Sequence, residues 1–391
     1  MASFLLAAHR PQTCLTSAAF HFTRRQITSS KLTIERSTDS DRFNNRPKNE
    51  DLLFGKTMSD HMLIVEWDEQ NKWGAPKIVP YQNLQISPVA SCLNYGITCF
   101  EGMKAYKALP DQSLRLFRPE LNMKRLQNSM KRLQMPGSDF VSDELIECIK
   151  ELVKVDSDWI PYGEGYSLYL RPNVIAMHEN LGLAAPTSTM LYVVSSPVGP
   201  YYKSGFKPIR LQSENSYVRA WPGGTGNSKV GGNYAPAMKP AAEAAKRGYE
   251  QVLWLLNDEI TEVGAMNVFF LWIDAKTGRK ELVTPPLDRG DILPGVTRQS
   301  VIELAKSWGE FDVCEKNITM SQVRDAAKDM QIIEAFGTGT AAVVTPISCI
   351  NYEGVDIEIP ATGGITQKIW NELADIQYGN IEHPDGWSVH I

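Results

Sequence analysis

The sequence predicts a mixed α/β protein with two domains. Segments rich in β-branched and aromatic residues alternate with segments whose apolar residues recur at helical spacing. The length, 391 residues, suits two ordinary domains with separate cores. Residues 195–208, "SSPVGPYYKSGFKP", contain three prolines and show little periodicity, so we expect a linker there. Ligands tend to bind where two such domains meet.

The elements divide between a smaller N-terminal α/β domain, 51–202, and a larger C-terminal domain, 203–391. In the first we expect strands at 62–67, 99–106, 167–177 and 190–198, and helices at 118–135 and 142–155. In the second we expect strands at 251–256, 268–274, 331–337 and 341–350, and helices at 235–247, 295–308 and 364–376.

Composition excludes several classes of function. Hydrophobic residues make up 43% and charged residues 22%, as in globular proteins. The formal net charge of −5 argues against a general nucleic-acid binder. No apolar run is long enough to predict a membrane span. The six cysteines form no CxxC pair and the six histidines no HxH or HExxH motif, so we expect no metal site.

The N-terminus has a composition of its own. Its first 34 residues contain Arg10, Arg24, Arg25 and Lys31, many serines and threonines, and no acidic residue. This composition is typical of a mitochondrial presequence and predicts a location in the matrix. An ordinary disordered tail on a cytoplasmic protein is the alternative. Residues 37–50 suggest a disordered connector, so 1–50 are assigned outside both domains.

A glycine-rich stretch, "RAWPGGTGNSKVGGNYAPA", surrounds Lys229 with five glycines. A Walker A phosphate loop would need glycine before the lysine and Ser or Thr after it, whereas Ser228 and Val230 stand there. A flexible surface turn remains an alternative. In favour of a ligand site, the glycines leave Lys229 open to a flat molecule, and Tyr234 could contact the same molecule.

Two other segments suit anions. In "ILPGVTRQS" a Pro-Gly turn leads into a helix whose first free N–H groups belong to Val296 and Thr297. In "FGTGTAAVV" a strand ends at Thr338 and Thr340. Each segment alone is as well explained by a plain helix cap or strand end. Together with Lys229 they indicate a phosphorylated aldehyde held as an imine, which is pyridoxal 5'-phosphate.

Seven motifs in order carry a family resemblance. They are "YGITCFEGMKAY", "RLFRPELNMKRL", "LYLRP", "RAWPGGTGNSKVGGNYAP", "ITEVGAMN", "ILPGVTRQS" and "FGTGTAAVVTP". From about residue 60 onward the chain resembles the branched-chain amino-acid aminotransferases among the fold-type IV pyridoxal-phosphate enzymes. The resemblance implies two α/β domains with the cofactor at their interface. It also implies reversible amino transfer from L-leucine, L-isoleucine or L-valine to 2-oxoglutarate, giving branched-chain 2-oxo acids and L-glutamate.

Alternatives to this activity are a D-amino-acid aminotransferase, an aminodeoxychorismate lyase and a non-catalytic binding protein of the same fold. The aromatic pocket disfavours the first two. The retained set of Lys229, Tyr234 and Glu262 disfavours the third.

The resemblance assigns the cofactor residues by position. Lys229 would be the catalytic lysine that carries the cofactor. Glu262 would face the pyridine nitrogen and keep it protonated, and Tyr234 would contact the ring oxygen. The phosphate would be bound by Arg125, Val296, Thr297 and Thr338.

The resemblance also assigns the substrate pocket. Its aromatic wall would comprise Tyr95, Phe100, Tyr169 and Tyr201, with Arg171 and the tyrosine hydroxyls accommodating the second carboxylate of glutamate. The backbone at Thr340 and Ala341 would receive the α-carboxylate. Leu183 would reach into a neighbouring subunit, which implies a homodimer.

Overall fold

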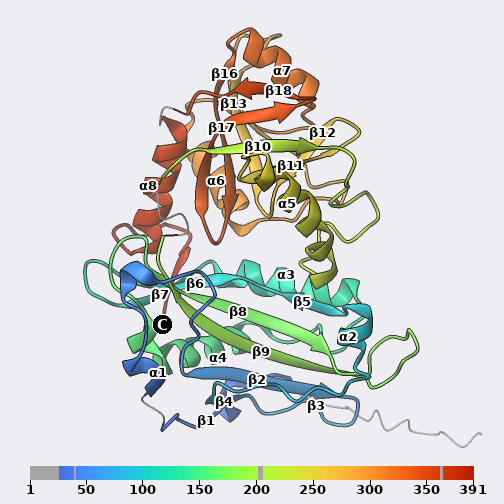
Figure 1. Ribbon diagram of the computed structural model, residues 1–391. Coiled ribbons are helices and arrows are strands. Elements are labelled where there is room, and N and C mark those ends of the chain that lie inside the picture. The colour runs from blue at the N-terminus through green and yellow to red at the C-terminus, as the bar shows by residue number, and fades with distance from the viewer. Residues whose placement is uncertain (1–25, 39–40, 201–205, 362–363) are drawn as a thin grey trace, which may run out of the picture.

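The computed structural model describes residues 26–38, 41–200, 206–361 and 364–391 and contains two β-sheets with helices packed against them (Figure 1). The predicted mixture of helices and strands is confirmed. The N-terminal sheet forms the lower half of Figure 1 and the C-terminal sheet the upper half.

The N-terminal sheet is mostly antiparallel. Its strands, in spatial order, are β1 (Thr33–Ile34), β4 (Lys77–Pro80), β2 (His61–Asp68), β9 (Ser188–Val198), β8 (Ser167–Ala176), β6 (Met103–Lys107), β7 (Leu114–Phe117) and β19 (Ser388–His390), with β3 (Lys72–Trp73) on β2 and β5 (Thr98–Phe100) on β8. The helices α3 (Pro119–Arg132) and α4 (Ser142–Val155) contribute to its core. In α4 the fully buried Leu145, Ile149 and Leu152 recur at helical spacing, which explains why the predicted bounds of this helix match the observed ones.

The C-terminal sheet has the order β12 (Glu259–Val263), β11 (Gln251–Leu256), β10 (Ile209–Glu214), β17 (Val343–Tyr352), β16 (Ile332–Gly339), β13 (Asn267–Ile273), β14 (Lys280–Thr284) and β15 (Asp312–Glu315), with β18 (Val355–Glu358) on β17. Its helices are α5 (Met238–Lys246), α6 (Val296–Trp308), α7 (Met320–Lys328) and α8 (Ile365–Gln377). Stacked Phe269 and Phe336, whose ring centroids lie 5.1 Å apart, belong to the core shared with α6 and α8.

The helix α7 and the strands β10, β12, β14 and β15 have no counterpart among the predicted elements. Two further differences concern the domains and the site. Strand β19, close to the C-terminus, pairs with β7 of the N-terminal sheet, so the end of the chain leaves the predicted 203–391 unit. The strand predicted over 99–106 is two strands, β5 and β6, with Glu101 and Gly102 between them. A Cβ at Gly102 would lie 2.0 Å from the Tyr169 hydroxyl, so any larger residue here would displace the Tyr169 side chain.

The N-terminal segment also packs more extensively than its composition suggested. Ile27 is fully buried in the core of the N-terminal sheet, and the Ser29 amide donates to the Glu144 carboxylate over 2.5 Å. Within the range expected to be a disordered connector, the Phe43 ring packs edge-on against Trp159 at 5.6 Å. Residues 26–38 and 42–50 therefore contact the N-terminal domain, whereas residues 1–25 lie outside the described part of the chain.

This packing predicts the effect of truncation. A chain beginning at Gln26 should unfold at the same temperature as the full-length protein. A chain beginning at Asn49 loses the burial of Ile27 and the β1–β4 pairing, so its midpoint should fall by about 5 °C or more. Thermal unfolding monitored by circular dichroism checks this. Equal midpoints for the two truncations would show that the segment contributes nothing to stability.

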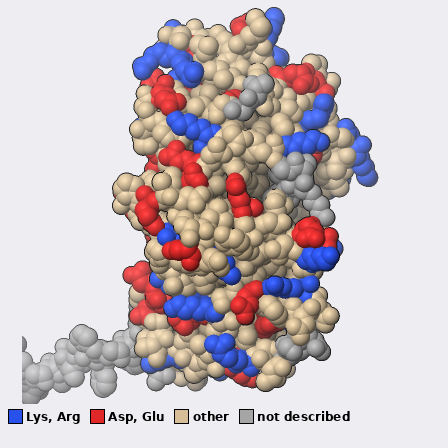
Figure 2. All heavy atoms as spheres, turned by 90° about the vertical axis from the view of Figure 1, so that its left-hand side faces the viewer, with Lys and Arg blue, Asp and Glu red and all other residues tan. Residues whose placement is uncertain are grey.

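No helix in the described residues is both long and apolar enough to cross a bilayer. On the face shown in Figure 2, acidic and basic side chains are interspersed and form no continuous basic surface.

Candidate active site

The loop that carries Lys229 is bound to the N-terminal domain. The Lys229 amide donates to the Ser129 hydroxyl on α3 (2.8 Å), and its carbonyl accepts from the Phe100 amide on β5 (3.0 Å). At Gly231 a Cβ would lie 2.4 Å from the Thr98 hydroxyl, so this glycine permits the close approach. The loop is therefore not a free surface turn, and it places Lys229 where the two domains meet.

The Lys229 amine is enclosed by aromatic rings and other cations. Its Nζ lies 3.3 Å from the Tyr234 hydroxyl and 4.9 Å from the centroid of the Phe100 ring. Burial, reinforced by the positive charge of Arg125, lowers the pKa of Lys229 to about 7. Burial also raises the pKa of Tyr234 to about 12, so the phenol keeps its proton. An amine that loses its proton readily and donates to the neighbouring phenol oxygen keeps its lone pair free to attack a carbonyl carbon.

The lowered pKa of Lys229 predicts a pH dependence for the cofactor-free protein. Only the neutral amine attacks an aldehyde, so covalent capture of pyridoxal 5'-phosphate should accelerate between about pH 6 and 8 and then level off. Stopped-flow absorbance checks this. A rate that keeps rising tenfold per pH unit above pH 9 would indicate an ordinary exposed lysine instead.

Glu262 is a buried carboxylate with two partners. Its Oε1 accepts from the Leu293 amide (2.7 Å), and its Oε2 lies 2.9 Å from the Nε of Arg219. Burial raises the pKa of Glu262, and the Arg219 charge opposes that shift. Sequence reasoning missed Arg219, although this residue opens the glycine-rich motif. The pair fixes the carboxylate at the domain interface.

Arg125 is fixed by a second carboxylate that sequence reasoning missed. Its Nε and Nη2 each lie 2.7 Å from one oxygen of Glu101, which is fully buried and also accepts from Asn122 (2.8 Å). The Nη1 of Arg125 donates to the carbonyl of Pro294 (2.9 Å), just before α6. This bidentate pair orients the guanidinium toward the N-terminus of α6.

Arg125 therefore depends on Glu101 for its counter-charge. Replacing Glu101 by glutamine should lower the unfolding midpoint of the cofactor-free protein by about 5–10 °C, because it leaves a buried cation unpaired. Added pyridoxal 5'-phosphate should stabilise this variant more than the wild type, since the phosphate supplies a new counter-charge. Differential scanning fluorimetry with exposed Glu120→Gln as control checks this. Equal stabilisation of both proteins would place the phosphate away from Arg125.

Donors suited to an anion gather where α6 begins. The first-turn amides of Val296 and Thr297 have no intrahelical acceptor. Thr338 on β16 pairs with Asn267 on β13, whose side-chain amide donates to the carbonyl of Leu293 (2.9 Å) just before α6. The Thr338 hydroxyl is buried and has no partner among the described residues. An unsatisfied buried hydroxyl beside a helix N-terminus suits a phosphate.

A cavity of about 400 Å³, here called the central cavity, lies against Lys229 and Tyr234. Its other lining residues are Phe54, Phe100, Gly102, Tyr169, Arg171, Gln251, Ala265, Met266, Gly339, Thr340, Ala341 and Ala342. The guanidinium of Arg171 lies 4.8 Å from the Phe100 ring centroid and donates to the Tyr169 hydroxyl (3.0 Å). The cavity thus brings together five of the predicted substrate residues.

Three predicted substrate residues do not line the central cavity in the described part of the chain. Tyr95, on α2 (Ser91–Tyr95), is 40% exposed and donates its hydroxyl to the Leu181 carbonyl. Leu183 is 77% exposed. Tyr201 lies outside the described residues. Conversely, Phe54 and Gln251 line the cavity without a sequence signal, because neither belongs to a recognisable motif.

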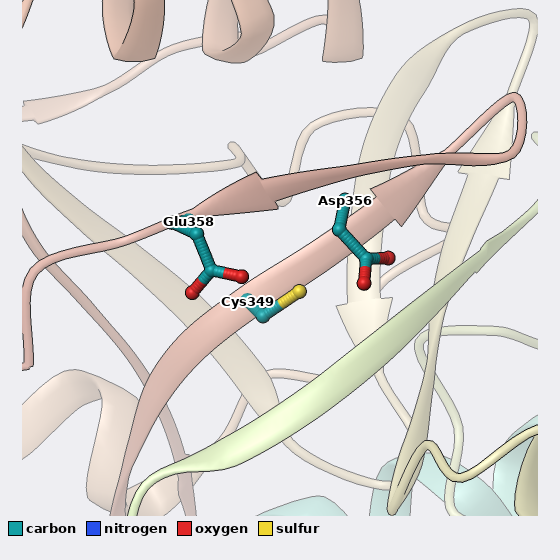
Figure 3. Close-up of side chains that lie close together, drawn as sticks. All are labelled: Cys349, Asp356 and Glu358. Atoms are coloured by element: carbon teal, nitrogen blue, oxygen red, sulfur yellow. The ribbon is translucent and has the colours of Figure 1, made fainter.

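One group of potential metal ligands occurs in the described residues, on the β17–β18 hairpin (Figure 3). The ligand atoms of Cys349, Asp356 and Glu358 lie within 4.8 Å of one another. The Asp356 carboxylate already accepts from Tyr249 (2.7 Å) and Asn351 (2.6 Å). Burial raises the pKa of the Cys349 thiol to about 11, which disfavours the thiolate that a metal needs. We interpret the group as a hydrogen-bonded hairpin contact.

Comparison with known proteins decides the family. Residues 98–350 match the family model described as amino-transferase class IV. The chain belongs to the class IV aminotransferases. This aminotransferase is 52% identical over 345 residues to a branched-chain-amino-acid aminotransferase of Dictyostelium discoideum, covering 87% of this chain and 90% of the relative. It is 46% identical to the mitochondrial enzyme of Saccharomyces cerevisiae, with 93% of each chain covered, and 47% identical to the cytosolic one, with 88% and 93% covered.

Solved structures agree with these relatives. The branched-chain aminotransferase of Thermoproteus uzoniensis with norvaline has a TM-score of 0.68 at 27% identity, covering 84% of this chain and 99% of that one. The branched-chain amino acid aminotransferase of Escherichia coli has a TM-score of 0.69 at 26% identity, covering 85% and 99%. The fold-type IV prediction is confirmed.

Pyridoxal 5'-phosphate is the cofactor of the class IV aminotransferases, and the residues of this site fit it. The neutral amine of Lys229 suits its aldehyde, and the unpartnered Thr338 hydroxyl with the free amides of α6 suits its phosphate. The buried Glu262 offers a carboxylate for a ring nitrogen.

Proposed function

We propose that this aminotransferase moves the amino group of L-leucine, L-isoleucine or L-valine reversibly to 2-oxoglutarate, giving the branched-chain 2-oxo acids and L-glutamate. The observation that carries the proposal is a central cavity that combines an amine of lowered pKa with aromatic walls. Phe54, Phe100 and Tyr169 present ring surface to an aliphatic side chain. The relatives named above support the same substrate class.

The residues in and around the central cavity have distinct roles in this proposal. Lys229 would hold the cofactor and, once released, would remove the proton from the α-carbon of the amino-acid substrate and deliver a proton to the α-carbon of the oxo-acid acceptor in the other half of the reaction. Tyr234 donates to the cofactor's ring oxygen, and Glu262 keeps the ring nitrogen protonated. Arg125, the α6 amides and Thr338 hold the phosphate. When bound, pyridoxal phosphate supplies an electron sink for the negative charge that develops at the α-carbon.

The two amino donors make different demands on one cavity. The branched side chains would need only apolar surface, such as the aromatic rings, whereas glutamate brings a second carboxylate. Arg171 lies in the same cavity, where its guanidinium stacks over Phe100 and could pair with that carboxylate. The backbone at Thr340 and Ala341 receives the α-carboxylate that both donors share.

Steady-state assays with the purified holoenzyme test the substrate class. The enzyme should transfer the amino group of L-leucine, L-isoleucine and L-valine to 2-oxoglutarate and so form L-glutamate. D-valine and D-alanine should react at least about 10²-fold more slowly. Preferential reaction with the D-amino acids, or release of pyruvate from aminodeoxychorismate, would replace the proposal by one of the alternative activities.

The enzyme acts as a homodimer in this proposal. Exposed Leu93, Tyr95, Leu181 and Leu183 come from α2 and a loop bound to it by the Tyr95–Leu181 hydrogen bond. Such grouped exposed apolar side chains often mark an interface. Light scattering after size exclusion should give twice the chain mass, and Leu183→Glu should weaken the association. A monomeric wild type at micromolar concentration would contradict the dimer.

The proposed location is the mitochondrial matrix. Because Ile27 is buried in the core of the N-terminal domain, we place the presequence ahead of it, where Arg10, Arg24 and Arg25 lie. A reporter fused to residues 1–25 should enter mitochondria, and the same fusion with the three arginines changed to glutamate should stay in the cytosol. A cytosolic wild-type fusion would favour the cytoplasmic alternative.

A further inference from the structure

Lys104 on β6 is a buried cation to which the mechanism above gives no role. It is 8% exposed, and its Nζ donates to the carbonyl of Ala341 over 2.9 Å. Burial lowers the pKa of Lys104 to about 8. Among the described residues no carboxylate forms an ion pair with it. A buried lysine without a counter-ion is costly, which suggests that the charge has a use.

The acceptor of this bond belongs to the tight turn between β16 and β17. Gly339 pairs with Val343, so Thr340, Ala341 and Ala342 form the turn. Val343 has a φ of 61°, a left-handed conformation that is strained for a β-branched residue. Strain of this kind persists only where surrounding contacts fix the backbone. The Lys104–Ala341 hydrogen bond is one such contact.

The turn separates two cavities. Thr340, Ala341 and Ala342 line the central cavity. Ala341 and Ala342 also line a second cavity of about 330 Å³, which Lys104 lines and Lys229 does not. In β-sheet register Lys104 stands opposite Tyr169, so the two side chains lie on the same face of the sheet, with Lys104 lining the second cavity and Tyr169 the central one. The Lys104 amine therefore lies on the second-cavity side of the turn, whereas the substrate would lie on the central-cavity side.

We propose that Lys104 is a positioning residue for the substrate's α-carboxylate. It holds the Ala341 carbonyl, so that the amides of the turn point into the central cavity, and it places a positive charge behind them. This inference rests on the proposed function, in which the backbone at Thr340 and Ala341 receives that carboxylate. The carboxylate reaches the turn amides and not Lys104 itself, because Lys104 does not line the central cavity.

Lys104 and Arg171 would then divide the recognition of carboxylates. Arg171 lines the central cavity and would contact only the second carboxylate of glutamate or 2-oxoglutarate. Lys104 would act on the α-carboxylate, which every substrate carries. Loss of Lys104 should therefore raise the KM of L-leucine and of 2-oxoglutarate by similar factors, with a smaller change in kcat.

A pair of isosteric inhibitors tests the inference on the holoenzyme. 4-Methylvalerate carries the carboxylate of a leucine-like molecule, and 4-methylvaleramide replaces it with a neutral amide. In Lys104→Met the inhibition constant of the acid should rise about tenfold, because a turn carbonyl loses its donor, while that of the amide stays unchanged. Lys104→Arg should retain most of the preference for the acid. Lys107→Met, on the same strand and outside both cavities, is the matched control.

Each outcome has a distinct meaning. If the wild type and Lys104→Met bind the acid more tightly than the amide by the same factor, the proposed role of Lys104 is wrong. The proposed carboxylate site at the turn would still stand. If the wild type binds acid and amide equally, the proposed carboxylate site itself is wrong. A loss that affects acid and amide alike would indicate a merely structural role and also overturn the inference. If Lys104→Met does not fold, the ratio of the inhibition constants of the acid and the amide is measured in Lys104→Gln instead, and the same outcomes apply.

Discussion

Replacing Lys229 by alanine should abolish transamination, with turnover of L-leucine falling by about 10⁴-fold or more. The side chain would lose both its functions at once: covalent attachment of the cofactor and proton transfer at the α-carbon. The fold should persist, because the Lys229 amine has Tyr234 as its hydrogen-bond partner and is repelled by Arg125. Removing a buried amine whose protonated form is disfavoured by burial and by Arg125 should leave the free energy of unfolding unchanged or raise it.

Two controls make the Lys229→Ala result specific. Lys239→Ala, on α5 and with a largely exposed side chain, should retain wild-type turnover. Added methylamine should partly restore turnover to Lys229→Ala, because a small amine can occupy the vacated space and carry the proton. Near wild-type transamination of L-valine by Lys229→Ala would exclude this lysine as the catalytic group.

The parts of the site predicted from sequence lie within single segments of chain. Lys229 and Tyr234 are five residues apart in one glycine-rich motif, and the start of α6 follows directly from a Pro-Gly turn. Such signals are local, so spacing and residue type are enough to find them. Most of the helices, though not α7, and most long strands are predictable for the same reason, since their periodicity is local.

The parts that sequence reasoning missed depend on pairings between distant segments. Glu101 falls within a predicted strand, and only its contact with Arg125 gives it a role. Lys104 resembles any strand lysine until the fold brings it to Ala341, 237 residues away in sequence. Ile27 escapes prediction for another reason: composition assigns its segment to a presequence, but composition does not report which single side chain enters the core.

Replacing Glu262 by glutamine should lower turnover on the order of 10²- to 10³-fold while the cofactor still binds. The proposed role of Glu262 is to keep the ring nitrogen of the cofactor protonated, and a neutral amide cannot stabilise that charge. Glutamine has nearly the same shape and can still accept from the Leu293 amide, so the site should keep its geometry. The electronic effect should therefore appear in kcat more than in cofactor affinity.

The ion pair with Arg219 complicates this result, because Glu262→Gln also leaves a buried guanidinium without its partner. That loss alone should destabilise the fold by roughly 3–5 kcal/mol. The double variant Arg219→Gln/Glu262→Gln removes both charges and separates the two effects. It should regain much of the lost stability in denaturant unfolding but none of the lost turnover. If the double variant recovered turnover together with stability, Glu262 would act only by neutralising the charge of Arg219, and its proposed role at the cofactor nitrogen would be wrong.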